Sequence, residues 1–166
     1  ITEEFVKMLR LNNRDEAIEF LVVTDLMRFI VSEFLDTIGC NQPPEFHPEG
    51  DVFTHTIKVL ENLPDNVSDE LLLAALFHDI GKPATFTNTD RIRFNNHDIV
   101  GAEMTENIMR RMKFSNEIIE HVVRMVENHM KFRFITEMKK SKLIKFMRMP
   151  KFDEHMQLHK ADCLGS

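Results

Sequence analysis

A chain of 166 residues that is 43% hydrophobic and 29% charged is long enough for one domain with a buried core. Its net charge of −6 argues against a general nucleic-acid binder, and no apolar run approaches the roughly 18 residues that a membrane span needs. The two cysteines, Cys40 and Cys163, offer no disulfide framework, so we expect a protein of the reducing cytoplasm.

Helical spacing begins at the start of the chain. Apolar residues three and four apart predict helices over 3–10 and 14–38, the second of which breaks at Gly39. The loop "NQPPEFHPEG" that follows contains three prolines and cannot be helical throughout. It separates an expected neck-like helical segment, residues 1–45, from a main body, residues 46–166.

The main body is also predicted to be helical. Asp51, Ser68 and Ser115 are expected N-caps of three helices, because their side-chain oxygens can accept hydrogen bonds from free backbone amides. The polar segment "TFTNTDRIRF" predicts a loop or a short hairpin. Further helices are expected over 97–113, about 136–148 and 152–163. No sustained alternation demands a sheet, so the fold class is all-α, an irregular helical bundle.

The segment "LLLAALFHDIGKPATF" carries the strongest chemical signal. An apolar helix ends on His78 and Asp79, and Gly81, Lys82 and Pro83 follow at once. Neighbouring side chains on a helix point about 100° apart, so both can reach one cation only near a helix end. An imidazole and a carboxylate suit Zn, Mn, Fe or Ni, and a carboxylate can bridge two ions. A His–Asp hydrogen bond in the core would explain the pair equally well.

Other side chains could supply further ligands. His55 flanks the apolar stripe of its helix, His129 lies at the edge of its own stripe, and Asp162 is expected on the inner side of the last helix. A buried carboxylate without a partner is costly, so Asp162 needs a cation or several donors. His121 is expected to point to solvent. Two rival ligands share the side of Asp162: His155 and His159.

The order of these residues resembles the H…HD…D pattern of the HD superfamily of metal-dependent phosphohydrolases. "HDIGK" is a specific form of its core motif. "FHPEGDVFTHT", "HDIVGAEM" and "ADCLGS" resemble the HD portion of bacterial tRNA nucleotidyltransferases and poly(A) polymerase-like proteins, although His47 in the first of these has no evident role beyond shaping its loop. The first forty residues resemble the helical neck that precedes this portion.

The nucleotidyltransferase head of that family, with its Gly-Ser loop and paired carboxylates, is absent from the sequence, so we expect no nucleotide addition by this chain. The chain is either an excised fragment or a free-standing relative. The resemblance implies a first metal site matched by four residues: His55, His78, Asp79 and Asp162. The extra histidines of binuclear members are matched by two more: His97 and His129. A two-ion site bridged by Asp79 is expected, with one ion or none as alternatives.

The ligand set predicts phosphate-ester chemistry, because a divalent cation lowers the pKa of bound water toward ~7 and stabilises a leaving oxygen. The metal is left open among Mn, Fe, Ni, Zn and Mg. The resemblance suggests phosphatase and 2′,3′-cyclic phosphodiesterase activity on a nucleotide or an RNA end. Asp79 and Lys82 are the expected catalytic residues; Lys82 either neutralises a phosphate oxygen or is solvated at the helix end. Weaker candidates for substrate contact are Arg91, Asp98, Lys131 and Arg133.

The charges are unevenly distributed. Residues 131–151 contain eight Lys or Arg and one acid, Glu137, whereas the remainder contains 13 basic and 26 acidic residues. This stretch is either a solvated helix face or a phosphate-facing patch that contacts tRNA. Two alternative functions follow: a non-catalytic body domain that positions RNA, and a nucleotide-sensing HD domain. The oligomeric state is not predicted.

Overall fold

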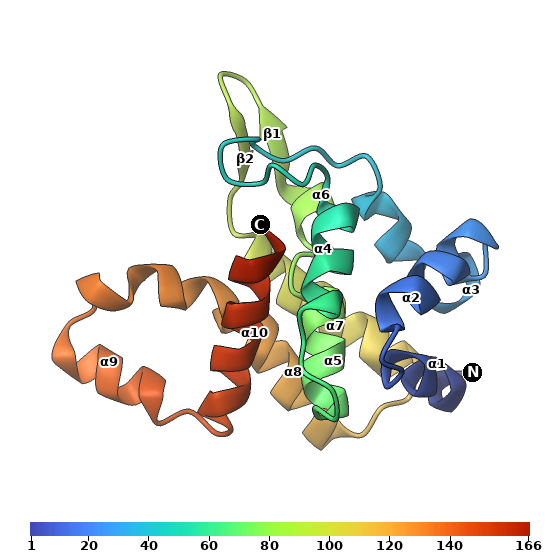
Figure 1. Cartoon of the computed structure of the whole chain (residues 1–166). Coiled ribbons are helices and arrows are strands. Elements are labelled where there is room, and N and C mark those ends of the chain that lie inside the picture. Colours follow the sequence, from blue (N-terminus) through green and yellow to red (C-terminus); the bar gives the residue numbers. More distant parts are fainter.

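A computed structural model describes all 166 residues, and ten α-helices dominate it, which confirms the all-α class (Figure 1). The N-terminal part contains α1 (Thr2–Leu9), α2 (Arg14–Val23), α3 (Met27–Ile30) and the 3₁₀ helix η1 (Ser32–Thr37). The rest contains α4 (Val52–Glu61), α5 (Asp69–Phe77), α6 (Lys82–Thr85), β1 (Phe86–Asn88), β2 (Ile92–Phe94), α7 (His97–Arg111), α8 (Asn116–Asn128), the 3₁₀ helix η2 (His129–Glu137), α9 (Lys140–Met147) and α10 (Phe152–Gly165). None of these helices combines the length and the apolar character needed to cross a membrane.

Helix α5 lies at the centre of the bundle. Every residue from Leu71 to Phe77 is buried, and the helix contacts α1, α4, α8 and α10 (Figure 1). A helix that is apolar on all sides is stable only when other elements surround it. Its N-terminus is capped by Ser68, whose hydroxyl accepts a hydrogen bond from the Leu71 amide at 3.1 Å. The C-terminal end of α5, at His78, is likewise buried in the interior of the protein.

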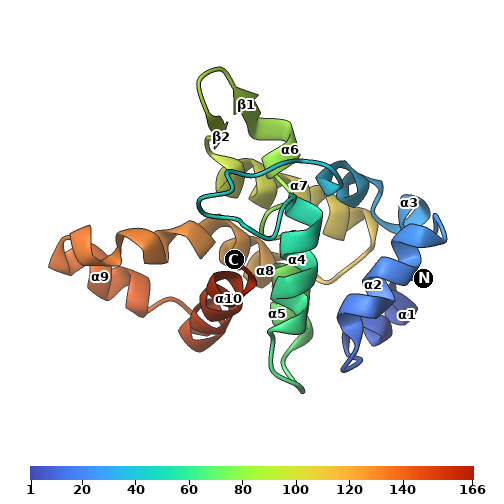
Figure 2. The ribbon, with the colours of Figure 1, turned by 45° about the horizontal axis from the view of Figure 1, so that its top comes forward.

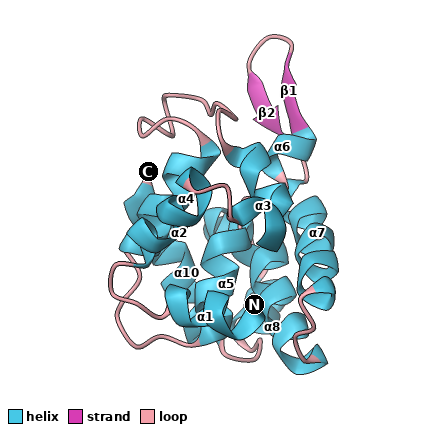
Figure 3. Cartoon of the chain, turned by 90° about the vertical axis from the view of Figure 1, so that its right-hand side faces the viewer, coloured by secondary structure: helices cyan, strands magenta, loops and turns pink.

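The other predicted caps are also present. The Asp51 carboxylate accepts a hydrogen bond from the Thr54 amide at 2.8 Å, and the Ser115 hydroxyl accepts one from the Ile118 amide at 3.4 Å. The segment after α6 forms the hairpin that was one of the two expectations, with β1 and β2 antiparallel and Phe86 opposite Phe94. Figure 3 shows this hairpin projecting from one end of the helical bundle.

The prediction of one helix over residues 14–38 is wrong. Asp25 has a φ of 59° and ends α2, and Val31, with φ −139° and ψ 81°, separates α3 from η1. Apolar spacing alone does not reveal these breaks, because the buried residues on both sides keep contact with the same core. The division at residue 45 stays a prediction, since side chains from both parts share one core cluster.

A buried arginine joins the N-terminal helices to the main body. The guanidinium of Arg14 donates hydrogen bonds to the carbonyl of Leu9 at 3.1 Å and to those of Leu60 and Leu63 at 3.3 and 3.1 Å. A buried charge is tolerated when its donors are satisfied in this way. The segments before and after the proline-rich loop are therefore held at a fixed relative position.

Two expectations for the C-terminal part need correction. The predicted helix over 136–148 is divided, because the extended residues Met138 and Lys139 separate η2 from α9. His121 is buried rather than solvated: α10 packs against that side of α8, and His121 Nε2 lies 2.7 Å from Glu154 Oε2. The apolar stripe of α8 alone did not show that a second face of the helix is covered.

His155 on α10 is buried without a polar partner. Neither of its ring nitrogens has a hydrogen bond, and only 2% of the residue is exposed. Burial lowers the pKa of His155 to about 4, with contributions from nearby His121 and Arg124. Lys131 acts in the same direction and Asp153 opposes it.

We therefore expect His155 to destabilise the fold in acid. Its folded-state pKa is below its unfolded value, so protons favour the unfolded chain as pH falls from 6.5 to 4. In chelator-treated protein, His155→Leu should remove about 3 kcal/mol of this loss in the free energy of unfolding, measured with urea at pH 7 and pH 4. The exposed neighbour variant Met156→Leu should follow the wild-type profile. Parallel profiles for all three proteins would contradict the prediction.

Candidate metal centre

Five helices deliver side chains to one point beside the end of α5. His55 comes from α4, His78 caps the C-terminus of α5, and Asp79 follows directly. The remaining three come from the start of α7, the junction of α8 and η2, and the last turns of α10: His97, His129 and Asp162. All six residues that the sequence predicts as metal ligands are thus brought together.

Gly81 makes this convergence possible by a close approach rather than by an unusual backbone conformation. Its φ is −79°, which any residue can adopt. A Cβ at this position would lie 2.3 Å from the His97 carbonyl oxygen and 2.5 Å from the Gly101 amide nitrogen. Only glycine lets the turn after α5 contact the first turns of α7, and this contact places His97 beside Asp79.

The six side chains form two trios, and the Asp79 carboxylate, which belongs to one of them, faces histidines of both. Oδ2 of Asp79 lies 3.2 Å from His78 Nε2 and 3.7 Å from His55 Nε2. Its other oxygen, Oδ1, lies 3.4 Å from His97 Nε2 and 3.6 Å from His129 Nε2. Donor atoms lie within 4.8 Å of one another in the trio His55, His78 and Asp162 and in the trio Asp79, His97 and His129.

Three of the histidines are held in the same tautomer. The Nδ1–H groups of His78, His97 and His129 each donate a hydrogen bond to the carbonyl three residues earlier, at 2.8, 2.8 and 2.6 Å. Their Nε2 atoms are buried without a hydrogen-bond partner and face Asp79. A free Nε2 lone pair with Nδ1–H bonded to a carbonyl is the arrangement of metal-binding histidines. These residues therefore fit a divalent metal.

The carboxylates at this point are held ionised. Burial alone would raise the pKa of Asp79, but Lys82, His78 and His129 outweigh it and keep this pKa well below its usual value. The pKa of Asp162 is lowered in the same way, because contact with His55 and the charge of His78 overcome burial. Burial opposes the charged form of His78, yet Asp79 and Asp162 raise its pKa.

Lys82 is a buried member of the centre. Its Nζ donates hydrogen bonds to Asp79 Oδ2 and Gln42 Oε1, each at 2.6 Å, and only 5% of the residue is exposed. The alternative of a solvated lysine at the helix end is therefore wrong. The Lys82 amino group instead compensates the charge of Asp79 and fixes which way its oxygens point. Gln42, which the sequence analysis missed, comes from the loop before α4 and carried no motif that would reveal it.

Glu49, a second residue that the sequence did not reveal, contacts His55 on the side away from Asp79 and Asp162. The Glu49 side chain is fully buried, and its Oε1 lies 2.8 Å from Nδ1 of both His55 and His47. A carboxylate beside Nδ1 turns the opposite nitrogen of His55 toward Asp79 and Asp162. His47, whose pKa is lowered by burial, holds Glu49 from the other side, which gives it the role that the sequence did not supply.

A cavity of about 710 Å³ opens above the ligands. The hairpin and the proline-rich loop form its walls, and two of the candidates for substrate contact, Arg91 and Arg133, line it. The structure does not bring the other two candidates for substrate contact to this cavity. Asp98 lies in the first turn of α7, and Lys131 donates a hydrogen bond to Asn128 and lines a different cavity.

The rival ligands on α10 lie elsewhere. His155 packs beside His121, with ring centroids 6.1 Å apart, and His159 stacks on Phe132 with centroids 4.7 Å apart. Neither belongs to a trio of potential ligands. The last helix therefore offers Asp162 alone to the centre.

Residues 52–164 match the family model described as "HD domain", so the chain belongs to the HD domain family. It is 33% identical over 136 residues to an A-adding tRNA nucleotidyltransferase of Deinococcus radiodurans, covering 78% of this chain and 31% of that protein. A multifunctional CCA protein of Legionella pneumophila (strain Paris) is 24% identical over 149 residues, 89% of this chain and 36% of the relative. A CC-adding tRNA nucleotidyltransferase of Thermus thermophilus is 29% identical over 137 residues, with coverages of 78% and 31%. The chain spans about a third of these relatives.

The two trios predict two metal ions per chain. We expect plasma mass spectrometry of protein incubated with Mn²⁺ and desalted to find two equivalents in the wild type. His129→Gln should retain one, because His129 belongs to one trio only. Asp79→Asn should retain none, because Asp79 belongs to that trio and its Oδ2 also faces His55 and His78 of the other. The matched control His159→Gln should keep two. Equal metal content in His129→Gln and the control would contradict the division into trios.

Glu49 is expected to strengthen metal binding through its contact with His55. Glu49→Gln should weaken Mn²⁺ affinity by about 10- to 100-fold, measured by competition with a chelating dye, because the Nδ1 partner of His55 is changed. Glu61→Gln, at the exposed end of α4, serves as the control and should bind as the wild type. An unchanged affinity in Glu49→Gln would show that His55 needs no support from this carboxylate.

Proposed function

We propose that this chain catalyses metal-dependent hydrolysis of a phosphate ester on a nucleotide or an RNA end. The proposal depends on one observation: the carboxylate of Asp79 belongs to one trio of potential ligands, faces two histidines of the other, and lines a cavity that also contains arginines. One or two ions of Mn, Fe, Ni, Zn or Mg bound there would lower the pKa of a water molecule toward ~7 and polarise the phosphate.

The chain's own residues would bind and orient the ester. Arg91 and Arg133 are cations that lie beside no acidic partner, so their guanidinium groups are free for phosphate oxygens. Lys82 lines the cavity and keeps Asp79 ionised, and its hydrogen bonds to Asp79 and Gln42 use two of its three donor hydrogens. Phe46, 63% exposed, and Phe94 add apolar surface for a ribose or a base. We assign the catalytic roles to Asp79 and Lys82.

The names of the relatives suggest where this activity belongs. Because they are tRNA nucleotidyltransferases and CCA proteins about two and a half times as long as this chain, we propose that it is the HD part of such a protein. Residues 1–45 would be its neck and residues 46–166 its HD domain, acting on tRNA or nucleotides in the cytoplasm. The HD part would hydrolyse and would add no nucleotides.

A turnover assay tests the proposal. Metal-loaded protein should release product from 2′,3′-cyclic AMP, adenosine 3′-phosphate or bis-p-nitrophenyl phosphate. Asp79→Asn should fall below about 1% of the wild-type rate, because one trio loses its carboxylate and the other loses the oxygen that faces His55 and His78. His159→Gln should retain the wild-type rate, and circular dichroism should show the same helical signal in all proteins.

Two results would reject metal-dependent hydrolysis at this site. Turnover that survives complete removal of metal, or an unchanged rate in Asp79→Asn, would remove the site from the reaction. Binding of nucleotide or RNA by metal-loaded wild type with no turnover would instead favour the sensing or RNA-positioning alternatives.

A further inference from the structure

We propose that a basic groove between η2 and α9 binds the backbone of single-stranded RNA, whose end would lie in the metal-centre cavity. The basic groove consists of two adjoining cavities of about 700 and 410 Å³. Four residues line both cavities: Lys131, Met138, Ser141 and Lys142. The link to the cavity rests on the function proposed above, whereas RNA binding by the groove does not.

The groove belongs to an arm that projects from the bundle. Figures 1 and 2 show η2 and α9 extending away from the other helices and returning to α10. Phe132, Phe146 and Phe152 hold the arm together, with ring centroids 5.0 to 5.7 Å apart. The groove is therefore formed before any ligand binds, which reduces the entropic cost of binding.

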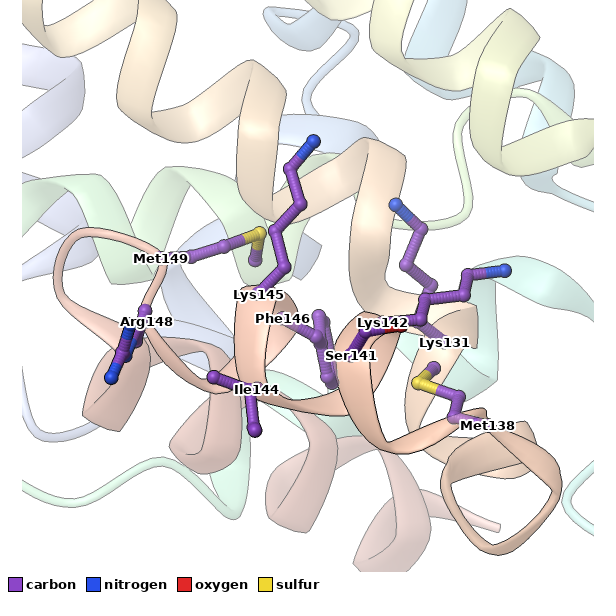
Figure 4. Close-up of a pocket in the computed structure, with 9 residues that line it drawn as sticks. All are labelled: Lys131, Met138, Ser141, Lys142, Ile144, Lys145, Phe146, Arg148 and Met149. Atoms are coloured by element: carbon purple, nitrogen blue, oxygen red, sulfur yellow. The ribbon is translucent and has the colours of Figure 1, made fainter.

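The cations of the arm have no acidic partners. None of the seven Lys and Arg side chains between residues 131 and 148 lies in an ion pair, whereas nine elsewhere in the chain do. Figure 4 shows the amino groups of Lys131, Lys142 and Lys145 extending on the same side of the groove. Unpaired cations on one side of a groove complement a polyanion.

The lining of the groove indicates which polyanion. Four of its residues are apolar: Met138, Ile144, Phe146 and Met149. Phe134, 53% exposed, adds an aromatic surface beside Lys139 and Lys142. A duplex presents mainly its phosphates, whereas a single strand offers phosphates to cations and unstacked bases to apolar and aromatic surface. The combination therefore favours single-stranded nucleic acid over a duplex or a purely acidic peptide.

The register of η2 connects the groove to the metal centre. Residues three apart lie on the same side of a 3₁₀ helix. Met130 and Arg133 line the metal-centre cavity, while the next series, Lys131, Phe134 and Glu137, lines the groove. A strand lying in the groove could thus pass over this one short helix and place its terminal phosphate near Arg133. An RNA end could therefore contact both the groove and the metal-centre cavity, whereas a mononucleotide would occupy the cavity alone.

Binding of a 12-nucleotide single-stranded RNA, measured by fluorescence anisotropy with metal-loaded protein, tests the groove. The double variant Lys142→Glu/Lys145→Glu should weaken binding by at least about 10-fold and reduce the dependence of affinity on salt. The matched control Lys58→Glu/Lys160→Glu makes the same charge change at exposed sites outside the groove and should stay within about twofold of wild type. Equal weakening in both variants would overturn the proposal, since it would reflect net charge alone.

Competition identifies the occupant. Single-stranded RNA should displace the probe at least about 10-fold more effectively than a blunt duplex or poly-glutamate; equal displacement by either competitor would overturn the assignment.

Kinetics test the connection to the metal centre. The groove variant should raise KM for an oligonucleotide with a 2′,3′-cyclic end and leave kinetics with 2′,3′-cyclic AMP unchanged. Equal effects on both substrates would reject the connection. Absence of turnover in the wild type would reject the proposed hydrolysis while leaving the anisotropy result to decide on the groove.

Discussion

The arrangement of the centre depends on the ionised carboxylate of Asp79 and its contact with Lys82. A carboxylate with 2% of its residue exposed would be protonated in an apolar interior, and the Lys82 ammonium 2.6 Å away prevents this. Because Lys82 binds Oδ2 from one side, both oxygens stay directed at the four imidazoles. Without this pair, the unpartnered Nε2 atoms of His97 and His129 would lose the anion that they face, and no carboxylate oxygen would link the two trios.

The helices of the bundle pack around α5, whose C-terminal end carries His78 and leads to Asp79. Helix α5 must be apolar on every side because its end has to reach the interior, and α4, α8 and α10 then cover it while contributing ligands of their own. Gly81 brings the first turn of α7 against the end of α5. The carbonyls of Ala75, Phe94 and Val126 orient three imidazoles, so backbone geometry near helix ends sets the tautomers. The helix packing that forms the core therefore also fixes the orientation of the metal-binding side chains.

The sequence predicts the parts of this arrangement that local patterns encode. Ser68, the apolar run after it and the His78–Asp79 pair define α5 and its end, and motif order predicts the six ligands that the structure brings together. Contacts between distant segments leave no such pattern. Gln42 and Glu49 lie in a proline-rich loop whose path depends on what it covers. The burial of His121 follows from the packing of α10, which the sequence of α8 does not encode. The breaks at Asp25 and Val31 depend on backbone angles that apolar spacing does not specify.

The uneven distribution of charge makes the arm the part of the chain best suited to bind RNA. Outside residues 131–151 the chain has twice as many acids as bases, so most of its surface repels a polyanion. A chain with net charge −6 can still bind RNA if the unpaired cations are gathered on one element, and this restricts the approach of RNA to that element. Since η2 carries His129 at its start, Arg133 toward the cavity and Lys131 toward the groove, a strand bound by the arm is directed to the metal centre. The acidic remainder thus contributes to specificity, because it favours the approach of RNA along the arm.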